Sequence, residues 1–233
     1  MTEKKVAILQ SNYIPWKGYF DIIGLVDEFI FHDDLQYTKN DWRNRNKIKT
    51  DTGTRWLTIP CGTDEHRLIC DVVLKDASWQ KQHWNIISQY YRKAPFFRTY
   101  KDFFEHFYLG EIHTNLSDMN QGLIKNISTQ ILGLKTTFKD SRTFNLQTHK
   151  AQRVLELLKK TGATYYLSGP AAQSYINPND FATENIQLEW MDYSNYSQYP
   201  QLYPPFEHAV SILDLIFNCG PDAIKFMKAN KCR

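Results

Sequence analysis

Residues 6–31, with the sequence VAILQSNYIPWKGYFDIIGLVDEFIF, contain the pattern that decides the fold. The run at 6–9 is continuously apolar, as expected for a strand that is covered on both faces. Apolar residues then recur at helical intervals over 19–26, and a second apolar run follows at 29–31. A short helix between two buried strands is typical of a βαβ unit with parallel strands, so this stretch predicts an α/β fold.

Apolar periods and turn residues mark the other elements along the chain. We expect strands at residues 56–60, 68–74, 137–139, 165–167 and 186–190. We expect helices at residues 78–91, 100–108, 116–132, 151–160 and 212–217, and a long irregular loop at 194–205. Since no repeat or long linker interrupts this order, the prediction is one α/β domain over residues 1–233. It has a Rossmann-like parallel sheet that begins with a nucleotidylyltransferase-like βαβ unit. A helix-rich portion at about 78–134 is inserted into it or follows it.

The composition excludes several classes of protein. The chain has 233 residues, 42% of them hydrophobic, with 28 Lys+Arg against 25 Asp+Glu, which argues against a disordered or fibrous protein. The four cysteines are scattered, so neither a disulfide scaffold nor a zinc finger is indicated, and a reducing cytoplasm is the expected location. No segment approaches the roughly 18 apolar residues of a membrane span. The net charge of +3 gives no reason to expect duplex nucleic acid as a partner.

The turn between the first strand and the first helix, at residues 10–19, is the first candidate site. Backbone N–H groups and a helix N-terminus at this position suit an anion such as a phosphate. The candidate substrate-binding residues of this turn are Gln10, Asn12, Tyr13, Trp16 and Lys17. The alternative is that Pro15 and Gly18 only shape a tight turn. Nucleotidylyltransferases related to class I aminoacyl-tRNA synthetases carry a His-x-Gly-His signature at this point. Residues 16–19 occupy that frame without either histidine, which favours a similar nucleotide-binding fold and argues against adenylyl transfer.

The polar stretch at residues 32–46 is the second candidate site. Asp33 and Asp34 directly follow a buried strand, and a carboxylate there could serve as a general base or hold a cation such as Mg²⁺. The other candidates supply guanidinium groups for phosphates or a carboxylate, amides for hydroxyl groups and a ring for stacking. These substrate-binding candidates are Gln36, Trp42, Arg43, Asn44, Arg45 and Asn46. The alternative is a solvated loop whose opposite charges pair with one another.

Three further residues are weaker candidates. His83 lies on the apolar stripe of the helix expected at 78–91, where it is either a satisfied core histidine or a catalytic base. Ser168 and Gly169 follow a predicted strand and could let the backbone approach a substrate, or they could form a plain turn before a helix. The histidines show no spacing that would place two metal ligands on one helix face, so no metal site is predicted.

Short matches along the chain resemble the WbqC-like protein family. They are LQ at 9–10, YIPWKGYF at 13–20, DDLQY at 33–37, WRNRN at 42–46, WLTIP at 56–60, YLSG at 166–169, SILDL at 211–215 and NCG at 218–220. The resemblance implies a bacterial protein often encoded among O-antigen or other surface-polysaccharide (lipopolysaccharide) genes. It also implies a role as an acyl or aminoacyl (glycine) transferase that modifies an amino sugar.

The expected function is therefore acyl or aminoacyl transfer to the amine of a nucleotide-linked amino sugar, with Asp33, Asp34 or His83 as the catalytic group. The cofactor stays open between an activated acyl or aminoacyl donor and ATP, and a homo-oligomer is also open. Two alternatives remain: an ATP-dependent ligase or nucleotidylyltransferase of the same pathway, and a non-catalytic nucleotide-sugar binding protein.

Overall fold

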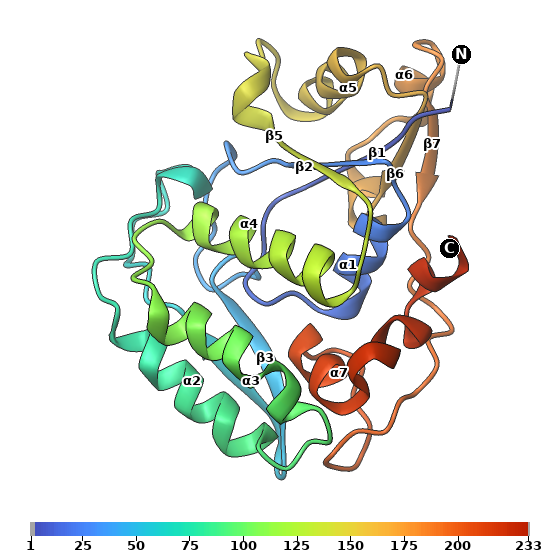
Figure 1. Cartoon of the computed structure of the whole chain (residues 1–233). Coiled ribbons are helices and arrows are strands. Elements are labelled where there is room, and N and C mark those ends of the chain that lie inside the picture. Colours follow the sequence, from blue (N-terminus) through green and yellow to red (C-terminus); the bar gives the residue numbers. More distant parts are fainter. Residues whose placement is uncertain (1–2, 233) are drawn as a thin grey trace.

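The computed structural model describes residues 3–232, and its centre is a parallel sheet (Figure 1). Within these residues five strands pair in the order β5-β2-β1-β6-β7, and every neighbouring pair is parallel. The strands are β1 (Lys5–Leu9), β2 (Glu28–Phe31), β5 (Thr137–Asp140), β6 (Tyr165–Ser168) and β7 (Gln187–Trp190). This arrangement confirms the predicted α/β fold with a Rossmann-like parallel sheet.

Helices cover both faces of the sheet, which is why its central strands are apolar on both sides. The helices are α1 (Lys17–Gly24), α2 (Ser78–Tyr91), α3 (Phe97–Glu105), α4 (Leu116–Asn126), α5 (Lys150–Thr161), α6 (Pro178–Ala182) and α7 (Ile212–Cys219). Val6 and Ile8 of β1 pack with α5 and α6, whereas Ala7 packs in the larger core with α1, α4 and α7. In Figure 1, α5 and α6 accordingly lie on one side of the sheet and α1, α4 and α7 on the other.

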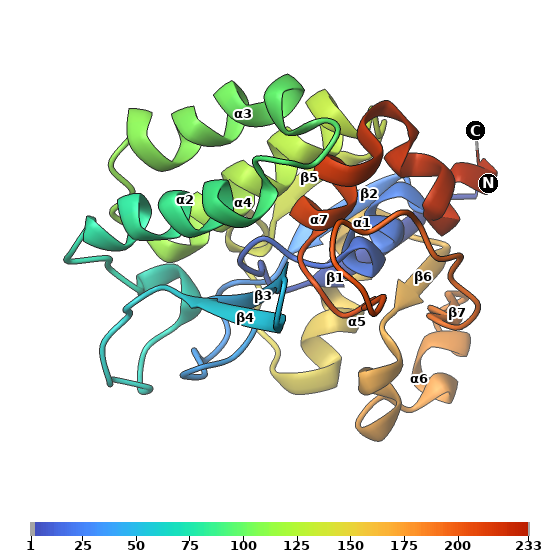
Figure 2. The same cartoon turned by 90° about the horizontal axis from the view of Figure 1, so that it is seen from below.

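A hairpin and a layer of helices extend the molecule beyond the sheet. The hairpin pairs β3 (Arg45–Thr50) with β4 (Gly53–Thr58), antiparallel. Figure 2 shows α2, α3 and α4 gathered at one side of the molecule, in agreement with the helix-rich portion expected at about 78–134. Tyr91 joins these parts, because its hydroxyl accepts a 3.0 Å hydrogen bond from the Lys49 backbone and donates a 2.9 Å hydrogen bond to Asp214 of α7.

One sequence-based assignment of secondary structure was wrong, and one strand was missed. Residues 68–74 do not form a strand: Ile69–Asp71 is a 3₁₀ turn. A contact distant in the sequence stabilises this turn, since the Asn115 side chain donates a 2.7 Å hydrogen bond to the Cys70 carbonyl. The sequence assigned no strand to residues 45–50, which form β3, where Asn46 and Ile48 are buried.

The order of the strands creates a crevice at one edge of the sheet. From β1 the chain continues to β2 on one side, and β6 later joins β1 on the other side. The connections after β1 and β6 therefore diverge at the carboxyl ends of these two strands, which is where ligands bind in open α/β sheets. Among the described helices, none is both long and apolar enough to cross a membrane.

Candidate functional site

A cavity of about 510 Å³ opens at the carboxyl ends of β1 and β6. We call it the edge cavity. Its lining residues are Ile8, Leu9, Gln10, His32, Leu35, Lys150, Val154, Tyr166, Ser168, Gly169, Ala171, Ala172 and Tyr175. An apolar wall with a few polar groups, in a volume of about 300–1,000 Å³, is the usual form of a small-molecule site. Gln10, Ser168 and Gly169, three of the predicted substrate-binding residues, lie in this wall.

His32 is a buried titratable group in the wall of the edge cavity. It follows β2 directly, and its Nε2 accepts a 3.2 Å hydrogen bond from Nε of Arg153 in α5. Burial, which disfavours the charged ring, lowers the pKa of His32 to about 4. The ring is therefore neutral at pH 7, and because Nε2 is the acceptor, its proton resides on Nδ1. His32 can thus donate a hydrogen bond from Nδ1.

Asp34 contacts both Arg153 and His32. Its carboxylate pairs with Nη2 of Arg153 and accepts a hydrogen bond from the Ser141 hydroxyl. Its Oδ1 also lies 3.7 Å from Nε2 of His32. The carboxylate predicted as a base is therefore already engaged by a guanidinium and a hydroxyl, and it fixes the position of Arg153 relative to His32.

The first turn of α5 adds positive potential beside the edge cavity. Lys150 lines the cavity, and its backbone adopts φ 53°, which is unusual for a residue other than glycine. His149 provides no side-chain cap, and the first turn holds no acidic residue. The N–H groups that begin a helix then lack side-chain partners, and together with Lys150 they suit a phosphate or carboxylate.

Asp33, the other predicted base, lies in the interior. Its Oδ1 accepts a 2.7 Å hydrogen bond from the Ser11 backbone, and its Oδ2 accepts from the Ser117 hydroxyl at 2.5 Å and from Nε2 of Gln121 at 3.1 Å. The residue is fully buried. These contacts connect the loops after β1 and β2 to α4, so Asp33 has a structural role beneath the crevice.

Arg43 connects the loop after β2 with the turn after β1. Its Nη2 donates a 2.9 Å hydrogen bond to Gln10, and its Nη1 lies 3.4 Å from Oδ1 of Asn12. Asp41 compensates the charge, with an Nη1–Oδ2 distance of 3.3 Å. The structure thus brings Gln10, Asn12 and Arg43 together, as expected if the two polar stretches share one site.

A second pocket, of about 310 Å³, lies on the far side of this link. We call it the tryptophan pocket, and it is lined by Asn12, Pro15, Trp16, Trp42, Asn46 and Ala209. Four of these residues were predicted from the sequence as substrate-binding. Asn12 lines the tryptophan pocket and Gln10 lines the edge cavity, while Arg43 hydrogen-bonds to both. The two pockets are therefore neighbours along the same edge of the molecule.

Lys17 faces away from both pockets. It is buried, its Nζ lies 4.5 Å from the ring centroid of Tyr196, and burial lowers the pKa of Lys17 to about 8. The N-terminus of α1 is covered as well, since Trp16 bridges to Ser211 and the Ile212 backbone bonds to Pro15. The helix N-terminus at the edge cavity is that of α5, whereas the sequence had pointed to α1.

Four other predicted residues serve the packing or the surface. The Tyr13 hydroxyl lies 2.8 Å from Nδ1 of His83 in the core, and burial lowers the pKa of His83 to about 4. Asn44 donates a 2.9 Å hydrogen bond to the Ile59 carbonyl. Gln36 is exposed and donates to the Glu65 carbonyl at 3.2 Å. Neither pocket includes these residues.

Lys150 and Arg153 were not recognised as candidates in the sequence. A signal was nevertheless present, because both residues fall in the first turn of the expected helix at 151–160 or just before it. The helix dipole favours carboxylates there, and two cations in that position are unfavourable unless an anion or a carboxylate compensates them. His32 stood in the polar stretch at 32–46 without an assigned role, and its partner is 121 positions away.

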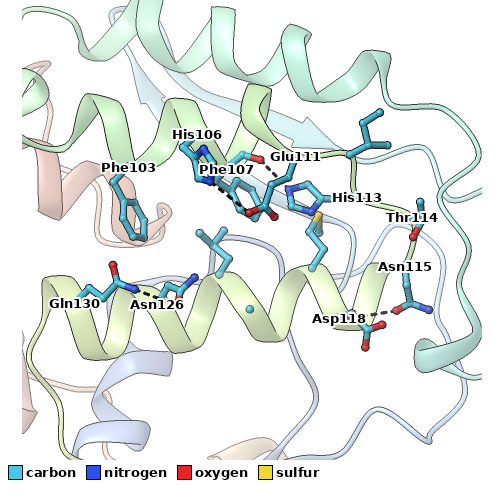
Figure 3. Close-up of a pocket in the computed structure, with 14 residues that line it drawn as sticks. Phe103, His106, Phe107, Glu111, His113, Thr114, Asn115, Asp118, Asn126 and Gln130 are labelled. Atoms are coloured by element: carbon cyan, nitrogen blue, oxygen red, sulfur yellow. Dashed lines mark hydrogen bonds and ion pairs between the residues drawn. The ribbon is translucent and has the colours of Figure 1, made fainter.

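Another cavity, of about 480 Å³, lies between α3 and α4, away from the sheet edge (Figure 3). Its polar groups largely pair with one another: His106 lies 3.4 Å from Glu111, and Nε2 of His113 lies 2.8 Å from the Phe107 carbonyl. None of the residues predicted from the sequence lines it. The edge cavity, where strand ends and candidate residues converge, is therefore the stronger candidate site.

Comparison with known proteins agrees with the resemblance found in the sequence. A model of the WbqC-like protein family matches residues 10–226. An uncharacterized protein of Mycobacterium tuberculosis, Rv1507c, is 44% identical over 227 residues, which cover 97% of this chain and 98% of that protein. No solved structure matches the chain. Both the family model and this relative match most of the chain, so the chain belongs to the WbqC-like protein family.

Proposed function

We propose that the chain transfers an acyl or aminoacyl group to the amine of a nucleotide-linked amino sugar, with the sugar in the edge cavity. The observation that carries the proposal is the convergence of Gln10, His32 and Lys150 at the switch point of the sheet. Gln10 and Ser168 offer hydrogen bonds to sugar hydroxyls, and Tyr166 and Tyr175 offer flat apolar surfaces. Lys150 and the N-terminus of α5 suit a phosphate or a carboxylate.

The chemistry of the transfer assigns a role to His32. The amine nitrogen attacks the acyl carbonyl carbon, the bond to the leaving group breaks, and negative charge develops on the carbonyl oxygen. The neutral His32 would donate its Nδ1–H to that oxygen, as hydrogen-bond donors in acyl-transfer sites do. The leaving group is the thiolate of an acyl-CoA, the ribose alkoxide of an aminoacyl-tRNA or the phosphate of an acyl phosphate. It takes up the proton that the amine releases, so atoms and charges balance without a free carboxylate of the protein.

Asp34 and Arg153 have a positioning role in this proposal. Arg153 contacts both His32 and Asp34, so it holds the imidazole in the orientation and tautomer that the transfer requires. Asp33 and His83 act through packing, because each is buried among partners outside the cavity. Of the three predicted catalytic residues, Asp34 therefore positions His32 through Arg153, whereas Asp33 and His83 have no part in the proposed transfer.

A non-catalytic nucleotide-sugar binding protein is the second candidate. It is favoured because both predicted carboxylates, Asp33 and Asp34, are already engaged by other groups of the protein and are not free to act as a base. An ATP-dependent ligase has less support, because the N-terminus of α1 is covered by residues 211–212.

The transferase proposal is tested by mass spectrometry of reaction mixtures. The purified protein is incubated with a panel of nucleotide-linked amino sugars and with acyl-CoA, with glycyl-tRNA, or with glycine and ATP. We expect a mass gain that corresponds to one N-acyl group on the sugar. A Gly169→Leu variant should lose this activity, because position 169 lines the cavity and no atom lies within 4 Å of an added Cβ.

Gly122→Leu is the matched control, since it adds the same side chain on α4, in the cavity between α3 and α4 and outside the edge cavity. Its activity should equal that of the wild type. If no donor yields an N-acylated sugar while the nucleotide sugar still binds, the protein is a binding protein. Release of AMP or pyrophosphate in step with product would instead identify an ATP-dependent ligase.

A further inference from the structure

Two cations and two tryptophans form a surface on the β3–β4 hairpin and the loop that precedes it, which we call the hairpin surface. The surface consists of Trp42, Arg45, Lys47 and Trp56. The two indole rings lie with centroids 5.6 Å apart and remain 44% and 40% exposed. The Arg45 guanidinium lies 4.3 Å from the Trp56 ring centroid, and Lys47 Nζ lies 5.0 Å from it. Large aromatic side chains are thus left accessible beside two positive charges.

The positive charge of this surface is uncompensated within the described chain. Arg45 and Lys47 take part in none of the ion pairs formed by the described residues, unlike Arg43, which pairs with Asp41. The Nε of Arg45 is buried and has no hydrogen-bond partner there. Two like charges near one ring repel each other, and a bound anion would relieve this repulsion.

The surface adjoins the tryptophan pocket through Trp42. Trp42 lines the pocket and also contacts Trp56. The pocket wall includes Pro15 and Trp16, and its amides come from Asn12 and Asn46. A flat ring could therefore lie against indole surfaces while a negatively charged group attached to it reaches Arg45 and Lys47.

From this arrangement we propose that the tryptophan pocket and the hairpin surface bind a nucleoside diphosphate. The base contacts Trp16, Trp42 or Trp56, and the phosphates pair with Arg45 and Lys47. A neutral sugar alone would use the rings and leave the two cations unpaired. If the proposed function holds, this nucleotide is the carrier half of the sugar substrate, and the sugar extends past Arg43 into the edge cavity; that last assignment rests on the proposed function, whereas nucleotide binding does not.

Isothermal titration calorimetry on the full chain tests this inference. The probes are ADP, GDP, UDP and dTDP, each compared with its nucleoside, with inorganic pyrophosphate and with glucuronate as an acidic sugar. We expect one or more diphosphates to bind at least about tenfold more tightly than the nucleoside and the pyrophosphate, because charge-assisted hydrogen bonds and stacking both contribute. Raising the salt concentration should weaken binding of the diphosphate and leave that of the nucleoside unchanged.

Matched variants locate the site. Arg45→Gln and Lys47→Gln should each weaken diphosphate binding by about tenfold, since each removes one charged partner. Arg55→Gln is the control: it removes the same charge from β4, at an exposed position next to Trp56 that faces the opposite side of the hairpin. Its affinity should match that of the wild type. Gly169→Leu should also leave diphosphate binding unchanged, because it alters only the edge cavity.

The outcomes separate this inference from the proposed function. Diphosphate binding that depends on Arg45 and Lys47 supports the inference even if no acyl transfer is found. The inference is overturned if no diphosphate binds, if Arg45→Gln and Lys47→Gln bind like the wild type, or if glucuronate binds more tightly than every diphosphate. Each of these results holds whatever the transfer assay gives.

Discussion

Nε of Arg153 donates a 3.2 Å hydrogen bond to Nε2 of His32, while Nη2 of the same guanidinium pairs with Asp34. One side chain in the first turn of α5 therefore orients two residues of the loop after β2. Because α5 and β2 are neighbours only in the folded chain, this contact depends on the complete βα arrangement. It also determines which ring nitrogen of His32 carries the proton.

Replacing Arg153 should change the titration of His32. The Arg153 charge lowers the pKa of His32, and Asp34 raises it. Burial is the largest cause of the lowered pKa and persists in Arg153→Gln. Because the positive charge disappears and Asp34 loses its cationic partner, we expect the pKa of His32 to rise from about 4 while staying below its ordinary value. NMR titration of the histidine ring protons measures this, with His32→Asn to assign the resonance. Arg153→Lys should not restore the wild-type titration, because an ammonium cannot form both contacts. An unchanged pKa in Arg153→Gln would contradict the proposed contact.

Replacing Asp33 should cost stability and leave the chemistry itself intact. In Asp33→Asn, the amide presents a donor to groups that are themselves donors, namely the Ser11 backbone, the Ser117 hydroxyl and Gln121. We expect the free energy of unfolding in urea to fall by about 3 kcal/mol. Asp222→Asn, at an exposed carboxylate paired with Lys225 at 2.9 Å, is the control and should change it by less than about 0.5 kcal/mol. An Asp33→Asn protein of wild-type stability without transfer activity would show that Asp33 is catalytic.

The buried histidines should make stability depend on pH. Burial lowers the pKa of His83 to about 4 from 6.5, so between these pH values the unfolded chain binds a proton that the folded chain does not. Stability is then fully present above about pH 6.5 and declines as the pH falls toward 4, by up to about 1.4 kcal/mol per pH unit for this group. The measurement is the free energy of unfolding of wild type and His83→Gln at several pH values. A variant with the same pH slope as the wild type would contradict the burial of a neutral ring.

Two glycines should respond in opposite ways to alanine. Gly169 has φ −70°, and an added Cβ would meet no atom within 4 Å. Gly220 has φ 55°, and its added Cβ would clash with the ring of Phe96. We expect Gly169→Ala to keep or raise stability, by up to about 1 kcal/mol, and Gly220→Ala to lower it by more than that amount. Thermal unfolding measures both. A destabilised Gly169→Ala would mean that the wall of the edge cavity is not open at that position.

The sequence predicted elements whose pattern is local. The βαβ start, α2 and α5 were recovered because apolar residues repeat with the period of their own segment. Strand β3 was missed because most residues of Arg45–Thr50 are polar or charged, so the segment lacks an apolar pattern of its own. Its strand character comes from pairing with β4. The order of the strands could also be predicted, and from it we inferred that the residues after β1, β2 and β6 form the candidate site.

Side-chain partners were beyond the reach of the sequence. Nothing local distinguishes Asp33, which points into the interior, from Asp34, which contacts Arg153. Lys17 belonged to a promising turn, yet its ammonium lies against Tyr196 from a distant loop. Such contacts depend on the relative placement of elements over 100 residues apart, and only the assembled fold determines them.

The most direct test of the central claim is the electron density of crystals soaked with a nucleotide-linked amino sugar. We predict the sugar between the ends of β1 and β6, with its amine beside His32 and Gly169, and the nucleotide against Trp42 and Trp56 with its phosphates on Arg45 and Lys47. Density for the ligand in the cavity between α3 and α4 instead, with the edge cavity and the tryptophan pocket holding only solvent, would contradict the account.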